Sequence, residues 1–309
     1  MESEILVVGE ALIDVVRRAG AEEEAYPGGS PLNVAIGLGR LGQEPTLATW
    51  YGRDEWAAMI ESHCARSNVR ILPGSDQAPF TTTASALIDE QGSATYTFHA
   101  DFHIAPLPQR HWRIIHTGSL AALIEPGASE ILGFIEAMKG RAFISFDPNC
   151  RPAAMGDHDL VRPLVERYVA ASDLVKVSNE DLAWIYPNQD TEEAWLDQAR
   201  CWVGLGPSVV VVTMGAQGAW AVTADTCLRV LADSSILLQD TVGAGDSFMS
   251  GLLHGVLTSN ATDLAALADP VTLAPILTLA ARISDITVSR RGADPPWLFE
   301  LHLGAGESP

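Results

Sequence analysis

Basic residues are scarce in this sequence. Its 19 lysines and arginines are outnumbered by 39 aspartates and glutamates, and the formal net charge is −20. Nucleic acids and anionic membrane surfaces are bound through basic patches, so this balance argues against both as partners. The only two lysines are Lys139 and Lys176, and no GxxxxGK[ST] string occurs, which excludes a P-loop.

Cysteines and long apolar runs are also few. The four cysteines form no CxxC pair and are expected to be reduced residues of a cytoplasmic protein: Cys64, Cys150, Cys201 and Cys227. No basic segment precedes the first apolar run, so residues 4–9 are predicted to form a strand and not a signal peptide. The apolar stretch 208–222 is interrupted by Gly215 and Gly218 and is too short to span a membrane.

The segments that are present alternate between strand and helix patterns. The chain has 309 residues, of which 47% are hydrophobic, enough for a sizeable core. The alternation predicts a parallel sheet with helices on its faces, and no linker divides the chain into separate domains. Residues 4–9 are expected to continue as one strand through 11–16, and the helices of 262–289 are expected to break at Pro270 and Pro275.

The alternation stops at residues 80–99. Two β-type runs flank a DEQG turn there, which predicts a hairpin. A hairpin inserted into such a chain suggests a lid over the sheet. Its Tyr96, Phe98 and His99 either face a ligand or pack the hairpin itself.

The segment DTVGAGDSFMSGLL, residues 240–253, predicts a glycine-rich turn that enters a helix. Gly243 and Gly245 permit a sharp turn, and the apolar residues after them follow a helical spacing. The free N–H groups and the dipole at a helix start bind anions, phosphate above all. Asp246 adds a carboxylate to this anion site. It is interpreted as a base that takes a proton from a hydroxyl attacking a phosphate, although an ordinary helix start also places Asp in its first turn.

A second glycine-rich segment, PGGSPLNVAIGLGRLG, spans residues 27–42. Gly28 and Gly29 suit a turn, Ser30 suits a helix cap, and Pro31 suits the first helical turn. Close packing of the helix on a sheet explains the glycines but not Asn33, which lies in that first turn.

Several polar residues follow apolar strands. Asp14 is the one charge in its strand, and is either solvated on an exposed face or committed to a ligand. Asp147, Asn149 and Arg151 cluster at a strand end, where open α/β sheets bind ligands. The turn TMGAQG, residues 213–218, is a second candidate phosphate-facing turn.

Together these motifs resemble the ribokinase-like (PfkB) carbohydrate kinase family over essentially the whole chain. DPNCR (147–151), KVSNEDL (176–182) and TMGAQG look like the fructokinase and ketodeoxygluconate kinase branch, and the tail SRRGADPPWLFEL (289–301) is similar to bacterial fructokinases.

The resemblance implies a fold and an activity. The fold is α/β: a ribokinase-like three-layer sandwich with a mostly parallel central sheet flanked by helices, plus a small β lid. One kinase domain would span 1–309, with the lid from about 11–27 and 78–104. The reaction would be ATP-dependent phosphorylation of a hydroxymethyl group of a small sugar, with D-fructose favoured. ATP and Mg²⁺ would be needed, with K⁺ as a further cation, and the lid would pair two subunits in a homodimer.

The resemblance also implies a role for each matching residue. Asp246 would be the catalytic base, and an anion hole would be formed by the N–H groups of Gly243, Ala244 and Gly245. The sugar would be bound by Asp14, Gly28, Gly29, Asn33, Phe98 and Arg151. The nucleotide would be bound by Ser178, Thr213, Gly215, Gly218 and Thr241. Asp240 with the 288–292 loop would hold the monovalent cation, and Asp181 would be the residue associated with Mg²⁺.

One motif departs from the family. Many relatives carry N-x-x-E near the metal, where this chain has Ser178 and Asp181, or else Asn179 and Glu180 in a shifted register. Phosphate oxygens and water are then expected to be the main Mg²⁺ ligands.

Three alternatives stay open. A 2-keto-3-deoxygluconate kinase needs a cation for its substrate's carboxylate, and Arg151 would supply one, but residues 80–104 contain no Arg or Lys. A nucleoside kinase would use an aromatic surface such as Tyr96 and Phe98. A catalytically silent sugar- or nucleotide-binding relative would typically lack the base or the glycines, and all of these are present.

Overall fold

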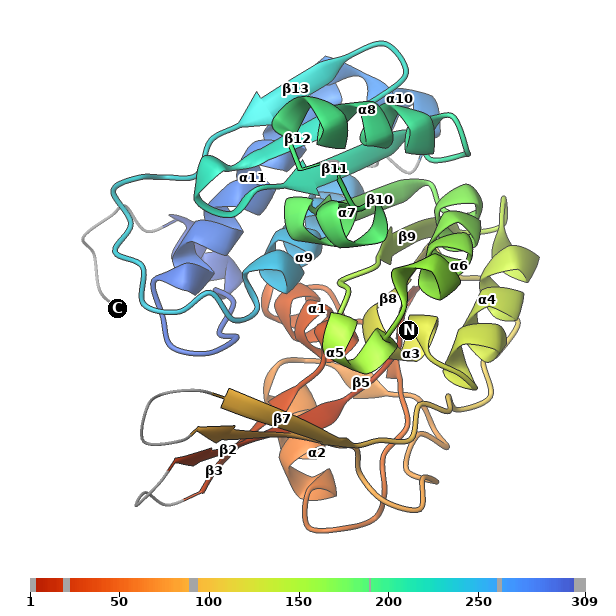
Figure 1. Ribbon diagram of the computed structural model, residues 1–309, viewed down its shortest axis with the longest axis vertical. Coiled ribbons are helices and arrows are strands. Elements are labelled where there is room, and N and C mark those ends of the chain that lie inside the picture. The colour runs from red at the N-terminus through yellow and green to blue at the C-terminus, as the bar shows by residue number, and fades with distance from the viewer. Residues whose placement is uncertain (1–3, 19–22, 89–93, 189, 260–262, 303–309) are drawn as a thin grey trace.

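The computed structural model describes residues 4–18, 23–88, 94–188, 190–259 and 263–302. Within these residues the strands form one nine-stranded sheet and one four-stranded sheet. The small sheet lies apart from the large one, at the bottom of the molecule in Figure 1.

The large sheet is mostly parallel, as predicted. Its strand order is β13-β12-β11-β10-β9-β8-β1-β4-β5, and antiparallel pairing occurs where β12 joins β11 and β13. The central strands are buried on both faces, which requires cover from two layers. The strands are β1 (Ile5–Val8), β4 (Thr46–Ala48), β5 (Arg70–Ile71), β8 (Ile114–Gly118), β9 (Phe143–Asp147), β10 (Leu174–Ser178), β11 (Val209–Thr213), β12 (Ala219–Val222) and β13 (Cys227–Val230).

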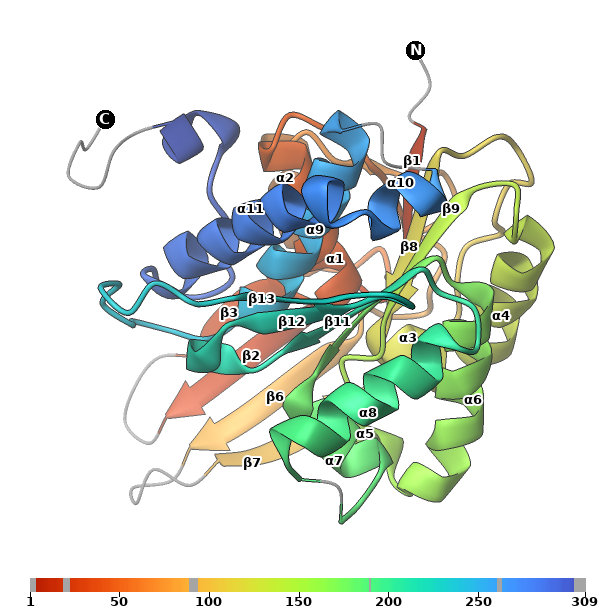
Figure 2. The same ribbon diagram turned by 90° about the horizontal axis from the view of Figure 1, so that it is seen from above.

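Helices cover both faces of this sheet and complete the expected three layers (Figure 2). One face packs against α1 (Ser30–Arg40), α2 (Ala57–Arg66), α9 (Ala244–Thr258), α10 (Leu264–Ala268) and α11 (Pro270–Val288). The other packs against α3 (Ser119–Leu123), α4 (Gly127–Met138), α6 (His158–Ala171), α7 (Asn179–Ile185) and α8 (Glu192–Val203), with the short α5 (Pro152–Met155) beside them.

The small sheet has the order β3-β2-β6-β7. Its strands are β2 (Leu12–Arg18), β3 (Glu24–Gly28), β6 (Thr83–Ile88) and β7 (Ala94–His99). β6 and β7 pair antiparallel, which confirms the predicted hairpin, whereas the DEQG turn itself lies outside the described residues. The sheet is completed by β2, which pairs with β3 antiparallel and with β6 parallel.

Two expectations about continuity were wrong. Residues 4–16 do not form one strand: β1 belongs to the large sheet and β2 to the small one, and Gly9 between them has φ 150°. Pro270 begins α11, but Pro275 lies inside that helix and does not end it.

Helix α11 is apolar and is a core helix of this fold. Among the described residues it is the one helix long and apolar enough to cross a membrane. It packs along α9 and buries Leu273, Leu277 and Ala280 there. This packing accounts for part of its apolar composition, since 39% of the apolar window is buried.

Candidate active site

The glycine-rich turn before α9 gathers free N–H donors. The helix begins at Ala244, after Gly243 with φ 75°, a left-handed conformation that suits glycine. The N–H of Ala244 donates to the carbonyl of Thr241 at 3.2 Å. Among the described residues, the N–H groups of Gly243, Gly245 and Asp246 have no hydrogen-bond partner. The anion hole of Gly243, Ala244 and Gly245 stays a prediction, in which the Ala244 N–H also bonds the Thr241 carbonyl.

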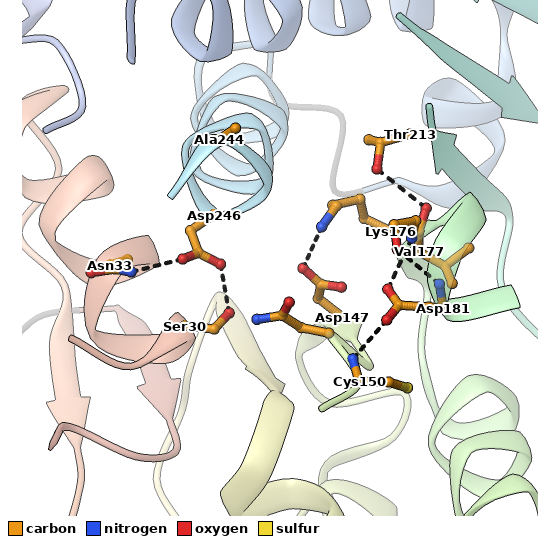
Figure 3. A network of polar contacts seen from close by, with 12 residues as sticks. Ser30, Asn33, Asp147, Cys150, Lys176, Val177, Asp181, Thr213, Ala244 and Asp246 are labelled. Atoms are coloured by element: carbon orange, nitrogen blue, oxygen red, sulfur yellow. Dashed lines mark hydrogen bonds and ion pairs between the residues drawn. The ribbon is translucent and has the colours of Figure 1, made fainter. Parts of the chain in front are cut away.

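The carboxylate of Asp246 is held by two residues of α1. Asp246 is 8% exposed, and it accepts hydrogen bonds from Ser30 Oγ at 2.7 Å and from Asn33 Nδ2 at 2.8 Å. The first turns of α1 and α9 therefore meet at this side chain (Figure 3). The predicted cap was wrong: Gly29 is the N-cap of α1, and the Ser30 hydroxyl donates to Asp246 instead.

A buried ion pair lies beside this helix start. Lys176 in β10 is 3% exposed, Asp147 at the end of β9 is fully buried, and Nζ donates to Oδ2 at 2.6 Å. A methyl group on Gly245 would come within 2.9 Å of Nζ, so the ammonium lies directly against the first turn of α9. Lys176 therefore joins the sheet to the glycine-rich turn before α9.

Neighbouring carboxylates decide the protonation of this pair. Burial acts to lower the pKa of Lys176, but the charges of Asp147, Asp181 and Asp246 outweigh it and raise that pKa above its usual value. Burial raises the pKa of Asp147 to about 6, against the opposing effect of Lys176. The neighbouring carboxylates therefore favour the charged form of Lys176.

Asp181 and Ser178 form a reciprocal cap at the start of α7. The Ser178 side chain accepts from the Asp181 N–H at 3.0 Å, and Asp181 Oδ2 accepts from the Ser178 N–H at 3.1 Å. Asp181 Oδ1 accepts from the Cys150 N–H at 2.7 Å. Both oxygens are therefore engaged with backbone, and they hold the β9 strand end against α7.

The residues predicted to bind the sugar lie near the small sheet. Asp14 is in β2, and a methyl group on Gly28 of β3 would lie 2.1 Å from its Oδ2. Burial raises the pKa of Asp14 to about 6, while the Arg151 guanidinium acts to lower it. Arg151 Nη1 donates to Asn149 Oδ1 at 2.7 Å and to the Cys150 carbonyl at 2.9 Å. The Phe98 side chain is not among the described side chains.

The residues predicted to bind the nucleotide lie on other turns. Thr213 ends β11, and Gly215 and Gly218 follow it with φ 52° and 88°. Asp240 joins the two segments predicted for a cation: its Oδ1 accepts from the Val242 N–H at 3.1 Å and its Oδ2 from the Gly292 N–H at 2.9 Å.

Sequence reasoning did not assign site roles to Ser30, Lys176 or Glu10. Glu10 is 4% exposed, its Oε2 accepts from the Ala121 N–H at 3.0 Å, and its Oε1 has no partner among the described residues. Lys176 carried a usable signal, because a charge inside the apolar strand LVKVS has to be paired when buried. Ser30 carried none, since its cap position was the simpler explanation.

Comparisons with known proteins identify the family and the fold. The family model described as "pfkB family carbohydrate kinase" matches residues 2–298. A fructokinase of Klebsiella pneumoniae is 31% identical over 303 residues, which cover 95% of each chain. Aminoimidazole riboside kinase from Salmonella enterica, solved with aminoimidazole riboside and an ATP analogue, is 25% identical with a TM-score of 0.79, over 96% of this chain and 98% of that one. A fructokinase from Vibrio cholerae O395 shares the fold, with 24% identity and a TM-score of 0.77 over 94% of each chain.

Proposed function

Since this chain belongs to the pfkB family of carbohydrate kinases and is an ATP-dependent sugar kinase, we propose that its acceptor is D-fructose, which it converts to fructose 6-phosphate. The observation that carries the phosphoryl transfer in this proposal is the position of Asp246. A buried carboxylate, oriented by Ser30 and Asn33, lies within the first turn of a helix whose free N–H groups suit phosphate. The fructokinase name of the Klebsiella relative supports the choice of sugar.

In the proposed reaction, Asp246 accepts the proton of the sugar hydroxyl as the hydroxyl oxygen attacks the γ-phosphorus of ATP in line. The N–H groups of Gly243 and Gly245, together with the helix dipole, stabilise the charge on the transferring phosphoryl group. Asp14 accepts hydrogen bonds from sugar hydroxyls, and Asn33 offers both donors and acceptors. The small sheet acts as the lid that excludes water and so limits hydrolysis of ATP.

Cations accompany the nucleotide in this proposal. The carboxylate oxygens of Asp181 both accept backbone N–H groups, which favours ATP oxygens and water as the Mg²⁺ ligands. When bound, Mg²⁺ neutralises charge on the phosphates. Asp240 and the 288–292 loop, joined through the Gly292 N–H, are the proposed place of K⁺. Thr213, Gly215, Gly218, Thr241 and Ser178 remain the proposed nucleotide contacts.

A neutral acceptor suits the charges near Asp14. Burial raises the pKa of both Asp14 and Glu10, while the guanidinium of Arg151 acts to lower both. A keto-acid would bring a negative charge into surroundings where burial already disfavours the charged forms of these two side chains. 2-Keto-3-deoxygluconate is therefore the less favoured acceptor, and preference for it would assign its carboxylate to Arg151.

The molecular context in this proposal is a cytoplasmic enzyme with small-molecule partners. The four cysteines are free, as expected in a reducing compartment. The proposed homodimer pairs the small sheets of two subunits, a contact that the exposed Tyr26 on the edge strand β3 would support.

The test is ADP release with Mg-ATP against D-fructose, 2-keto-3-deoxygluconate, ribose and adenosine. Turnover on fructose above the others is the expected result. Preference for the keto-acid or adenosine would replace the acceptor but keep the kinase. ATP binding by folded protein without turnover on any acceptor would favour the catalytically silent alternative.

A further inference from the structure

Lys176 and Asp147 place two charges in a layer that is otherwise largely apolar. The alternate residues of their strands, Leu174 and Phe143, pack in the core between the large sheet and α9. Desolvation offsets much of the attraction within a buried ion pair, and apolar residues of similar volume often replace one without loss of stability. The stability of the fold is therefore a weak reason for this pair.

The position of the pair points to the chemistry instead. Nζ lies against Gly245, whose N–H is a free donor of the anion-binding turn, and any side chain on Gly245 would displace the ammonium. In Figure 3 the ammonium points into the space between Asp246 and Asp147. Asp147 Oδ1 is buried without a partner among the described residues, and the one recorded bond of Nζ goes to Oδ2. The pair thus has unused hydrogen-bonding capacity at the start of α9.

The charges around this turn would oppose a phosphate without Lys176. Asp147, Asp181 and Asp246 all act on Lys176 and favour its charged form. Three carboxylates facing a triphosphate would repel it, and the chain offers few cations to compensate, with a net charge of −20. The ammonium of Lys176, which lies against this turn, reduces the repulsion between the carboxylates and a phosphate.

We propose that Lys176 is a positioning residue for phosphoryl transfer: anchored by Asp147 against Gly245, its ammonium supplies the fixed positive charge under the anion-binding turn of α9. The inference rests on the proposed kinase reaction, because its consequence is stronger binding of the phosphates and faster transfer. A structural role alone would require only that the two buried charges cancel each other.

The decisive experiment removes both charges together. The double variant Lys176→Met/Asp147→Asn leaves no uncompensated buried charge, so it is expected to fold, with a thermal midpoint near that of the wild type. We expect kcat to fall about 100-fold, the scale of losing one preorganised electrostatic contact, while KM for the sugar stays within about threefold. Lys176→Met alone is expected to lose stability as well as kcat, because Asp147 stays buried and unpaired.

The matched control is Lys139→Met, which removes the chain's other lysine. Lys139 is exposed and its Nζ donates to the Ala170 carbonyl at 2.6 Å, so its loss is expected to leave kcat unchanged. A folded double variant with kcat within threefold of the wild type would overturn the proposal and leave the pair a purely structural role.

ADP binding by isothermal titration calorimetry gives a readout that does not depend on turnover. We expect the double variant to bind ADP up to about tenfold more weakly than the wild type, because it lacks the ammonium that lies against Gly245, although the loss of the Asp147 carboxylate offsets part of that effect. If the wild type phosphorylates no acceptor, that result counts against the proposed function, and the ADP titration alone decides the role of Lys176. Equal ADP affinities of the wild type and the double variant would then overturn the proposed role of Lys176.

Discussion

The carboxylate of Asp246 is fixed before any substrate arrives. Ser30 and Asn33 each donate to one of its oxygens, at 2.7 and 2.8 Å, and each oxygen keeps a second lone pair for a substrate proton. In the proposed reaction, this carboxylate is already oriented to accept a proton before the substrate binds. The helices α1 and α9, which are far apart in the chain, therefore position this carboxylate together.

Asp246→Asn tests the base directly. The amide retains an acceptor oxygen for Asn33 and a donor for the Ser30 hydroxyl, so the fold is expected to persist. An amide cannot take up the proton, and kcat is expected to fall by about 10² to 10⁴ in the ADP-release assay. Asp197→Asn, at an exposed carboxylate of α8, is the control and is expected to behave like the wild type. Near-normal turnover by the Asp246 variant would remove its assignment as the base.

The proposed role of Asp14 predicts a pH dependence of the reaction. Burial raises its pKa to about 6 from 3.8, so the carboxylate that would accept sugar hydroxyls becomes protonated as the pH falls below about 6. We expect kcat/KM for the sugar to decrease in that range. Asp14→Asn is expected to have low activity that does not decrease further below pH 6. A wild-type profile that is flat from pH 5 to 7 would contradict the role of Asp14.

The same shift has the opposite sign for stability. The folded state binds the Asp14 proton more tightly than the unfolded state, so this residue's contribution to stability decreases as the pH rises from about 4 to 6. At pH 7 the buried charge therefore costs stability, and Asp14→Asn is expected to raise the thermal midpoint while lowering activity. A lower midpoint for this variant at pH 7 would contradict this account.

At the scale of elements, α9 lies close against its neighbours because of its glycines. A methyl group on Gly251 would lie 2.7 Å from Ala280 Cα of α11. A methyl group on Gly37 of α1 would lie 2.4 Å from Ser250 Oγ of α9. Close contact on both sides brings the first turns of α1 and α9 together at Asp246.

Gly251→Ala is therefore expected to destabilise the protein. The added methyl group meets backbone and not a mobile side chain, and overpacking of this kind costs about 1–3 kcal/mol. Gly133→Ala is the matched control, because Gly133 lies in α4 and no described atom lies within 4 Å of the added methyl group. It is expected to raise the free energy of unfolding by about 0.5–1 kcal/mol. Denaturant unfolding of both variants measures the difference. Equal changes in the free energy of unfolding for the two variants would show that α9 and α11 can move apart without loss of stability.

At the scale of the whole molecule, the small sheet has two edge strands, β3 and β7. Tyr26 on β3 is 54% exposed, an unusual place for a large aromatic residue unless it is covered in an assembly. Edge strands also pair readily with other chains. Both features support the proposed contact between the lids of two subunits.

Sedimentation velocity tests this assembly. We expect twice the chain mass of 33.0 kDa for the wild type and a shift toward the single chain for Tyr26→Arg. Leu160→Arg, at an exposed leucine of α6 away from the small sheet, is expected to leave the mass unchanged. A wild type that sediments as a single chain would exclude the dimer under those conditions.

Local patterns in the sequence determined the sheet, its covering helices, the hairpin and the glycine turn before Asp246. Each of these depends on neighbours along the chain, as in the apolar strands and the helical spacing after Gly245. The sequence also identified Asn33 as unexplained by packing, and the structure joins it to Asp246 across 213 positions.

Only the tertiary structure decided what those side chains contact. Ser30 suited a helix cap by its position, but the approach of α9 gave its hydroxyl a stronger acceptor in the Asp246 carboxylate. Pro275 suited a break, but its flanking turns are held in one helix by packing on α9. In the sequence, Lys176 is a single charge in an apolar strand with no evident partner. In the structure, the parallel register of β10 and β9 places Asp147 beside it. Contacts between distant segments depend on packing in three dimensions, which the local pattern of residues does not contain.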